Sequence, residues 1–353
     1  MSLSVHIRKK LGDFEAHVDF ETASEPLGLL GASGCGKSVT LNCIAGIMKP
    51  DSGRIELNGK VLFDSEKHIN LPPQKRNIGY MFQEYALFPN MTVLENIQAG
   101  VRSGTRSEKK AAALQAVERF HLGDVIKQYP KTLSGGQKQR TALARILVGN
   151  PELLLLDEPF SALDSYLKWQ LLWEMAEYLQ PYTGDVLFVS HDREELSKLC
   201  RSVCVLDNGR SEPVQSFKSF LSRPQTIASA KLAGYRNIAF GSVSGGLFSC
   251  PSWNITLPCN NPLATGVCLS DECLHAEKIT GTDVGIECIV AGYSSEGEKN
   301  MLMLRPVNGA DGSLLCMLSP ESEICAGETI FAYFSQNNAV FLTNTAIVSE
   351  CFS

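Results

Sequence analysis

The sequence predicts an α/β protein, with a mostly parallel sheet covered by helices and a smaller all-β domain after it. First, strand-like and helix-like patterns alternate as far as about residue 206, which is typical of a parallel sheet. Second, a glycine-rich stretch, residues 31–38, lies between a strand pattern and a helix pattern. Third, short strand-like runs separated by Gly, Asn, Pro and Ser follow residue 236. The 353 residues suffice for two domains, which we place at 1–235 and 236–353.

The elements of the first domain follow from hydrophobic periodicity. Residues 3–20 alternate apolar and polar side chains around a Gly12-Asp13 turn and predict a hairpin. A short apolar strand at 27–30 leads through glycines into a helix at 38–48, where apolar residues recur at helical spacing. The same criteria predict strands at 54–63, 78–82, 153–156, 185–189 and 202–206, and helices at 109–120, 136–148 and 166–179.

The second domain is predicted from runs such as 286–290, 301–304 and 329–334. It also holds eight of the twelve cysteines. No C-x-x-C pattern occurs and the first residues show no pattern of a secretion signal, so we expect reduced thiols rather than disulfides. These cysteines are interpreted as small buried apolar residues, with metal binding as the alternative.

Composition excludes several functional classes. The net charge of −6 argues against broad nucleic-acid binding through a basic face, so we expect no nucleic-acid partner. No stretch approaches the roughly 18 to 20 consecutive apolar residues of a spanning helix. The first ten residues lack the pattern of a cleaved leader, and a cytoplasmic location is the expectation.

The stretch GASGCGKS, residues 31–38, fits the phosphate-loop pattern G-x-x-x-x-G-K-[ST]. Its glycines let backbone N–H groups converge on phosphates, and the helix that follows adds the positive end of its dipole. Lys37 supplies a full charge, and Ser38 offers a hydroxyl to Mg²⁺. Cys35 lies inside this loop and is interpreted as a small passive residue. The alternative is a glycine-rich turn without a ligand.

Two further patterns support a phosphate site. The apolar strand 153–156 ends in Asp157 and Glu158, an acid pair at the carboxyl edge of the predicted sheet, where ligands of open α/β folds bind. Asp157 would help to hold Mg²⁺, and Glu158 would act on water as a general base. Upstream, LSGGQ at 133–137 enters a helix as an anion-binding N-terminus would. A simple helix cap is the alternative there.

Taken together, these motifs give the chain a resemblance to a known family. Residues 1–235 resemble the nucleotide-binding ATPase subunits of ATP-binding cassette (ABC) transporters. The stretches 31–38, 153–158 and 133–137 look like the Walker A, Walker B and signature motifs. Three more matches are Gln83 with the Q-loop glutamine, Ser161-Ala162-Leu163-Asp164 with the D-loop, and His191 with the switch histidine. The resemblance implies the phosphate-loop ABC ATPase fold with a helical subdomain at about 84–150.

The resemblance also implies the site and its chemistry, which is ATP hydrolysis with Mg²⁺. It places nucleotide contacts at Gly31, Ser33, Gly34, Cys35, Gly36, Lys37, Ser38, Val39, Phe14, Ser134, Gly135, Gly136, Gln137 and Asp164. Ser38, Gln83 and Asp157 would hold the metal. Glu158, His191 and Gln83 would be catalytic. Two cassettes would pair head to tail, so that each ATP is covered by the signature residues of the other copy.

One residue stays open between two interpretations. The family stacks adenine on an aromatic side chain near the N-terminal hairpin turn, and Phe14 is the candidate here. Leu11 stands where several relatives place that aromatic. Phe14 as a core residue is an equal alternative.

The cargo is inferred from resemblance alone. Residues 87–93 and 131–164 look like the importer branch, and 64–76 with 234–238 look most like molybdate-import ATPases, although Tyr235 stands where relatives usually have Cys. Alternatives are sulfate, iron(III) or another small solute, or a soluble non-transport ABC protein. The implied partners are permease subunits and, indirectly, an extracytoplasmic solute-binding protein, with the chain peripheral at the cytoplasmic face of the membrane.

The tail of the importer branch carries small oligonucleotide-binding-like (TOBE-type) barrels with regulatory roles, which the region 236–353 resembles loosely. Two functions follow as alternatives. The tail binds an incoming oxyanion and locks the transporter, or it only holds the dimer together.

Overall fold

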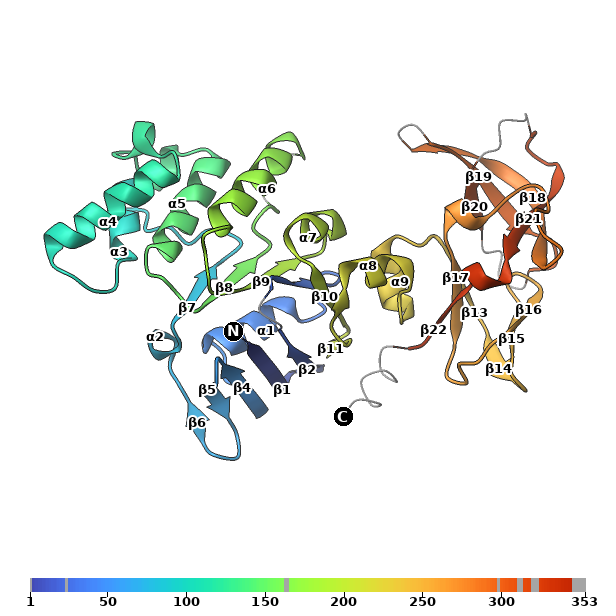
Figure 1. Ribbon diagram of the computed structural model, residues 1–353, viewed down its shortest axis with the longest axis horizontal. Coiled ribbons are helices and arrows are strands. Elements are labelled where there is room, and N and C mark those ends of the chain that lie inside the picture. The colour runs from blue at the N-terminus through green and yellow to red at the C-terminus, as the bar shows by residue number, and fades with distance from the viewer. Residues whose placement is uncertain are drawn as a thin grey trace. The chain divides into compact units, whose positions relative to one another are not determined.

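A computed structural model of the chain describes residues 2–22, 25–161, 165–296, 299–309, 314–318 and 324–344. The chain divides into two compact units, Met1–Phe217 and Lys218–Ser353 (Figure 1). Each unit has its own hydrophobic core.

One sheet runs through the first unit, and the described residues contribute twelve strands to it. The strand order is β6-β5-β4-β1-β2-β11-β10-β3-β9-β8-β7, with β12 paired to β10. The strands are β1 (Leu3–Leu11), β2 (Phe14–Glu21), β3 (Leu27–Leu30), β4 (Ser52–Leu57), β5 (Lys60–Asp64), β6 (Ile69–Asn70), β7 (Ile78–Met81), β8 (Leu153–Asp157), β9 (Asp185–Ser190), β10 (Ser202–Asp207), β11 (Arg210–Ser211) and β12 (Gln215–Ser216).

The sheet has an antiparallel half and a parallel half. Strands β6, β5, β4, β1 and β2 pair antiparallel, and β10, β3, β9, β8 and β7 pair parallel. Every residue of β3, β8 and β9 is buried, as expected for parallel strands covered on both faces. The register aligns Leu30 with Ser190 and Asp157 with Val189, so the carboxyl ends of β3, β9 and β8 lie at one edge.

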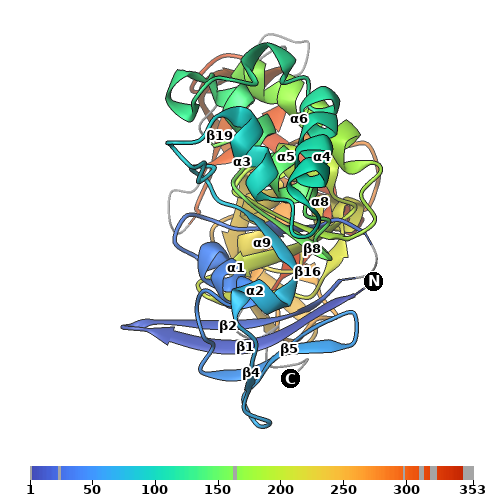
Figure 2. The same ribbon diagram turned by 90° about the vertical axis from the view of Figure 1, so that its left-hand side faces the viewer.

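The helices of the first unit are α1 (Lys37–Ala45), α2 (Pro73–Arg76), α3 (Val93–Ala99), α4 (Arg106–Arg119), α5 (Gly135–Leu147), α6 (Ser165–Leu179) and α7 (Arg193–Leu199), with short 3₁₀ turns at Gly123–Val125 and Pro130–Thr132. Helix α1 contacts β2 and β8 and lies between the two halves of the sheet (Figure 2). Helices α3, α4 and α5 gather at one side of the unit (Figure 1).

The far end of α1 is held by a buried cation. Arg76, on α2, has 0% exposure and donates from Nη1 to the carbonyls of Cys43 and Ile44 at 2.9 and 2.8 Å. These are among the last carbonyls of the helix, which have no partner inside it. The guanidinium therefore satisfies the carboxyl end of α1, opposite to the end that follows the phosphate loop.

The structure confirms most of the predicted elements, divides one of them, and adds short helices and strands that the sequence did not predict. Residues 54–63 form no single strand, because Asn58 and Gly59 adopt positive φ (53° and 79°) and turn the chain into the β4–β5 hairpin. Helices α3 and α7 were not predicted from sequence. Both are only seven residues long, too short for a clear helical period, although Thr92 caps α3 in a capping box and Asp192 caps α7.

The second unit is mostly β, with α8 (Phe217–Ser222, beginning at the boundary) and α9 (Ile227–Ala233) before its strands and two later 3₁₀ turns at Asp271–Cys273 and Gln336–Asn338. Its three described sheets have the orders β13-β17-β22, β14-β15-β16 and β20-β19-β18-β21. The strands are β13 (Asn237–Phe240), β14 (Ser242–Ser244), β15 (Leu247–Cys250), β16 (Ile255–Pro258), β17 (Gly266–Leu269), β18 (Asp283–Glu296), β19 (Lys299–Pro306), β20 (Leu315–Leu318), β21 (Thr329–Ser335) and β22 (Val340–Leu342).

The core of the second unit contains Trp253 and Phe248, which are 2% and 0% exposed. Cysteines fill small positions in it, and Cys250, Cys259 and Cys288 belong to the same buried cluster. All cysteines among the described residues are free thiols. Burial raises the pKa of Cys288 to about 12, which keeps the thiol neutral and unreactive.

Candidate nucleotide site

The phosphate loop lies where the sequence predicts it, between β3 and α1. Gly34 and Gly36 have φ values of 80° and 109°, a region that side-chain-bearing residues avoid. Gly31 is required for a different reason, because a Cβ there would stand 2.3 Å from the carbonyl oxygen of Leu206 on β10. The loop is thus packed tightly against the sheet, while Ser33 and Gly34 are exposed.

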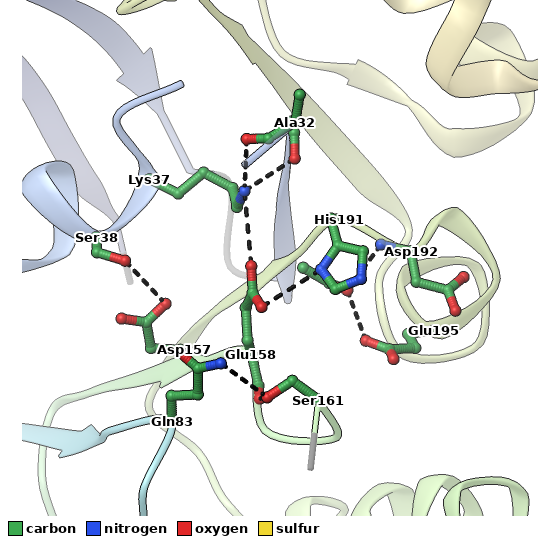
Figure 3. A network of polar contacts seen from close by, with 12 residues as sticks. Ala32, Lys37, Ser38, Gln83, Asp157, Glu158, Ser161, His191, Asp192 and Glu195 are labelled. Carbon is green, nitrogen blue, oxygen red and sulfur yellow. Dashed lines mark hydrogen bonds and ion pairs between the residues drawn. The ribbon is translucent and has the colours of Figure 1, made fainter. Parts of the chain in front are cut away.

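Lys37 begins α1 and is 5% exposed. Its Nζ donates to the carbonyls of Gly31 and Ala32 at 2.8 and 2.9 Å and lies 3.6 Å from Oε1 of Glu158 (Figure 3). A buried ammonium needs such partners to offset its lost hydration. Its side chain therefore bends back over the loop and presents its charge beside the acid that ends the neighbouring motif.

Asp157 ends β8 and is 8% exposed. Ser38 Oγ donates to its Oδ1 at 3.4 Å, and the hydroxyl of Tyr80 on β7 donates to its Oδ2 at 3.1 Å. Burial raises the pKa of Asp157 above its ordinary value, although these two hydrogen bonds act in the opposite direction. A bound cation would favour the charged carboxylate at this position.

Glu158 lies between two nitrogen groups. Its Oε1 faces Lys37, and its Oε2 is 3.3 Å from Nδ1 of His191 (Figure 3). The Glu158 side chain is 18% exposed and that of His191 is 53% exposed. The carboxylate is therefore partly shielded from water, while the imidazole is open to a ligand.

Gln83 follows β7 and reaches the same edge of the sheet. Its Nε2 donates to Ser161 Oγ at 3.2 Å, and that hydroxyl donates to the carbonyl of Glu158 at 3.0 Å. The amide of Gln83 is thus connected, through one hydroxyl, to the backbone that presents Glu158 (Figure 3).

A second polar network lies behind His191. Ser190 donates to Oε2 of Glu195 at 2.6 Å, and Lys168 on α6 lies 2.6 Å from both Asp192 and Glu195. Glu195 and Ser190 are 4% and 2% exposed, so this end of the network is desolvated, while the side chains of Lys168 and Asp192 are 25% and 30% exposed. It ties α6 and α7 to the end of β9 and fixes the backbone on both sides of His191.

The signature-like residues stand at the N-terminus of α5 and form a capping box. Ser134 Oγ accepts from the backbone N–H of Gln137 at 3.3 Å, and Gln137 Oε1 accepts from the N–H of Ser134 at 2.9 Å. Ser134 is exposed and Gly136 is buried. The structure does not bring these four residues, 134–137, into the polar network around Glu158.

Four predicted residues remain to be placed. Cys35 is 6% exposed and belongs to the buried core of the first unit. Phe14 is half-buried and packs beside the loop, since a Cβ at Gly36 would lie 2.9 Å from its Cζ. Val39 is half-buried against the core of the first unit. Asp164 lies outside the described residues.

The donor set fits a divalent cation next to a polyphosphate. Ser38 and Asp157 supply a hydroxyl and a carboxylate within 3.4 Å of each other, and oxygen is the ligand that Mg²⁺ prefers. Lys37 stands beside them at the N-terminus of α1, where the helix dipole favours an anion. Among the described residues, no three or more His, Cys, Asp or Glu side chains lie close enough together to hold a metal ion by themselves.

Sequence reasoning missed Tyr80, Lys168 and Glu195. Tyr80 stands three residues before Gln83, but nothing in the sequence indicates that its hydroxyl meets Asp157. Lys168 contacts Asp192 and Glu195, which lie 24 and 27 residues further along the chain. No local sequence pattern indicates these contacts. Only tertiary structure reveals them.

The fold and site define the class of protein, a phosphate-loop nucleotide-binding protein with its site at the carboxyl edge of a parallel sheet. Residues 17–161 match the ABC transporter family. The chain is 42% identical over 210 residues to the molybdate/tungstate import ATP-binding protein WtpC of Archaeoglobus fulgidus, covering 60% of this chain and 85% of that protein. The chain therefore belongs to the ABC transporter family of ATP-binding proteins.

Two further relatives are named for different substrates. WtpC of Thermococcus kodakarensis is 42% identical over 232 residues, covering 65% of this chain and 68% of that protein. The Fe(3+) ions import ATP-binding protein FbpC of Haemophilus influenzae (strain 86-028NP) is 40% identical over 212 residues, covering 60% of each chain.

A solved structure gives the same fold. The dimeric post-hydrolysis state of an ATP-binding cassette bound to ADP and Pi has a TM-score of 0.52 and 26% identity to this chain. The match covers 62% of this chain and 99% of that one. In the part of the chain that the structure describes, no helix combines the length and apolarity needed to cross a membrane.

Proposed function

We propose that this chain is the ATP-hydrolysing subunit of an importer. The observation that carries the proposal is the convergence of Lys37 and His191 on the carboxylate of Glu158, at 3.6 and 3.3 Å, beside the phosphate loop. Family membership and the importer names of three relatives support it.

The phosphate loop binds the nucleotide in this proposal. The backbone of residues 31–38 surrounds the phosphates, and Lys37 exchanges its contact with Glu158 for a phosphate oxygen. Loss of that ion pair releases the carboxylate for chemistry. Phe14, which lies beside Gly36, is proposed to support the adenine ring.

Ser38, Asp157 and Gln83 are the residues that would hold Mg²⁺. The ion would neutralise charge on the β- and γ-phosphates when bound. Tyr80 orients Asp157 through its hydroxyl, so that one carboxylate oxygen stays directed at Ser38.

Glu158 acts as the general base in this proposal. It accepts a proton from the attacking water, while His191 donates a hydrogen bond to the γ-phosphate from the open side of the site. The ion network of Lys168 and Glu195 holds the backbone that presents His191. The residues thus contribute positioning and electrostatics rather than a covalent intermediate.

A homodimer completes each site. The related cassette structure is dimeric, and the exposed Ser134 at the N-terminus of α5 suits a role in covering the nucleotide of a second copy. Asp164 is proposed to contribute to nucleotide binding.

The proposed cargo is molybdate or a related oxyanion, as the names of two relatives suggest. Iron(III) is the second candidate, favoured by the 40% identity to FbpC. The partners are permease subunits and, through them, an extracytoplasmic solute-binding protein, with this chain at the cytoplasmic face of the membrane.

We propose further that residues 236–353 form a TOBE-type regulatory domain and that residues 1–235 form the ATPase domain. The β-rich second unit and its separate core support a division into two domains, although the compact second unit begins at Lys218, before α9. Calorimetry of the full chain with molybdate or tungstate, without nucleotide, tests oxyanion binding. An absence of heat would leave only the dimer-holding role.

Elemental analysis of cells tests the function as a whole. Molybdenum, tungsten, sulfur and iron contents are compared between the wild-type host and a Glu158→Gln strain. We expect molybdenum alone, or molybdenum with tungsten, to collapse in the variant. A fall in iron or sulfur alone would retain the importer and overturn the cargo, and no change in any element would count against import.

A further inference from the structure

The turn that follows β8 contains a strained backbone. Glu158 has φ of +43°, in the left-handed region that residues with a Cβ rarely adopt. Such a conformation costs free energy and persists only when the surroundings fix it, and it is concentrated at functional sites. The turn that presents Glu158 must therefore be held by neighbouring groups.

Part of the restraint is local. The N–H of Glu158 donates to the carbonyl of Val189 on β9 at 3.0 Å. The carbonyl of Glu158 accepts from the N–H and the Oγ of Ser161 at 3.2 and 3.0 Å. These bonds fix the start and the end of the turn, and they leave the first of its two middle residues, Pro159, to be held by other groups.

Pro159 has no N–H, so its carbonyl is its one backbone hydrogen-bonding group. Two buried side chains donate to that oxygen, Gln139 from Nε2 at 3.0 Å and Tyr85 from its hydroxyl at 3.3 Å. Gln139 is 2% exposed and Tyr85 is 6% exposed. Buried hydrogen bonds of this kind are worth most because a lost partner leaves a desolvated polar group behind.

The two donors come from segments with other proposed tasks. Gln139 lies on α5, five residues after Ser134, which caps the helix. Tyr85 lies two residues after Gln83 and has a positive φ of 60°. The helix also holds this second segment, because Arg145 donates to the carbonyls of Tyr85 and Ala86 at 3.1 and 2.8 Å.

We propose that Gln139 and Tyr85 are positioning residues for Glu158. They hold the Pro159 carbonyl, keep the strained turn in place, and connect the N-terminal end of α5 to the catalytic carboxylate of the same chain. The inference rests on the proposed function of Glu158 as general base. In a dimer whose α5 N-terminus covers the nucleotide of the other copy, this connection couples the two ATP sites.

The test compares Gln139→Met, Tyr85→Phe and the double variant with Thr141→Val. Thr141 is the matched control, since it is 0% exposed on the same helix and donates to the Gln137 carbonyl at 2.7 Å, away from Pro159. Gln139→Met removes the donor and keeps the length of the side chain. We expect kcat to fall about tenfold in Gln139→Met, with KM changed less than about twofold, because misplacement of a catalytic group affects the chemical step.

Hydrogen exchange provides a readout that needs no turnover. The amides of Glu158 and Ser161 are expected to exchange faster in Gln139→Met than in Thr141→Val. The two variants are expected to have equal melting temperatures, so that the difference reflects the turn and not global stability. The double variant should lose more activity than the product of the two single losses, since each donor partly replaces the other. The Hill coefficient for ATP should fall towards one.

Three outcomes decide between the possibilities. Equal kcat and equal exchange in Gln139→Met and Thr141→Val would overturn the positioning role and leave the proposed function intact. A wild-type chain without ATPase activity would overturn the proposed function, and the exchange data would still test the restraint on the turn. A kcat loss with an unchanged Hill coefficient would retain the positioning role and overturn the coupling between sites.

Discussion

The two units of this protein bury different kinds of side chain. In the first unit, charged and amide groups are buried beside the nucleotide site, among them Lys37, Gln139, Asp157 and Glu195. In the second unit, the buried polar residues that the structure describes are all uncharged, and its core is apolar with interspersed cysteines. Buried charge is costly unless it is paired. The first unit also buries charge away from the site, as at Arg76 and Asp64, so it is the whole unit that tolerates buried charge and the polar network around Glu158 that marks the site. We therefore expect the chemistry in the first unit. Any binding function of the second unit is expected on its surface, because its described core holds no charged group.

The largest expected effect tests the chemical side of this comparison. Glu158→Gln keeps the shape of the side chain but cannot accept a proton, so kcat for ATP should fall by about 10³-fold or more while nucleotide binding persists. Steady-state phosphate release and equilibrium ATP binding measure the two quantities. Glu194→Gln, an exposed acid on α7, is the control and should retain wild-type turnover. Near-normal turnover in Glu158→Gln would contradict the role of Glu158 as general base.

A core substitution tests the structural side. Trp253→Ala should lower the free energy of unfolding of the second unit by about 4 kcal/mol, because it leaves a large cavity in an apolar core. Urea unfolding of the full chain, followed together with ATP binding, separates the units. Phe240→Ala, at a residue 56% exposed, should cost under about 0.5 kcal/mol. If Trp253→Ala loses ATP binding at urea concentrations below those that unfold the whole chain, the two units are not independent in stability.

Removal of the buried lysine should have a smaller effect, confined to binding. Lys37→Ala deletes the charge that meets the phosphates, and ATP affinity should fall about 100-fold. Titration with a fluorescent ATP analogue measures it. Lys49→Ala, exposed beyond the far end of α1, should bind as the wild type does. Comparable losses in both variants would indicate a general charge effect and contradict a specific contact.

The smallest expected effect concerns the ion network behind His191. Lys168→Met leaves the buried Glu195 without its cation, and the free energy of unfolding at neutral pH should fall by about 2 kcal/mol. Denaturant unfolding measures the loss. Lys198→Met, on the neighbouring helix α7, is the control. A loss no larger than that of the control would show that the network adds little to stability.

The same variant has a pH signature. Burial acts to raise the pKa of Asp192, but hydrogen bonds from Lys168 and the amide of Glu194 outweigh it, so this pKa lies below its ordinary value. The stability it contributes is complete above the unfolded pKa of about 3.9 and is lost as the pH falls through the folded pKa. In Lys168→Met, stability should therefore fall less steeply on acidification through this range.

Local sequence patterns predicted the parts of the molecule that local physics determines. The loop glycines, Lys37 and the strand that ends in Asp157 need only spacing and periodicity. The ABC ATPase fold and family follow from these motifs together. By contrast, the contacts of Tyr80 with Asp157 and of Gln139 with Pro159 join segments 77 and 20 residues apart. No periodicity encodes such contacts, because they arise only when the sheet and α5 pack together.

The buried Arg76 at the far end of α1 changes how that helix acts on a distant anion. A bare helix is a dipole, whose positive and negative ends partly cancel at a distance. Here a guanidinium on the last carbonyls neutralises the negative end inside the protein. What an approaching anion meets is closer to a net positive charge, whose potential falls more slowly with distance than that of a dipole. The loop can therefore attract a polyphosphate before any residue touches it.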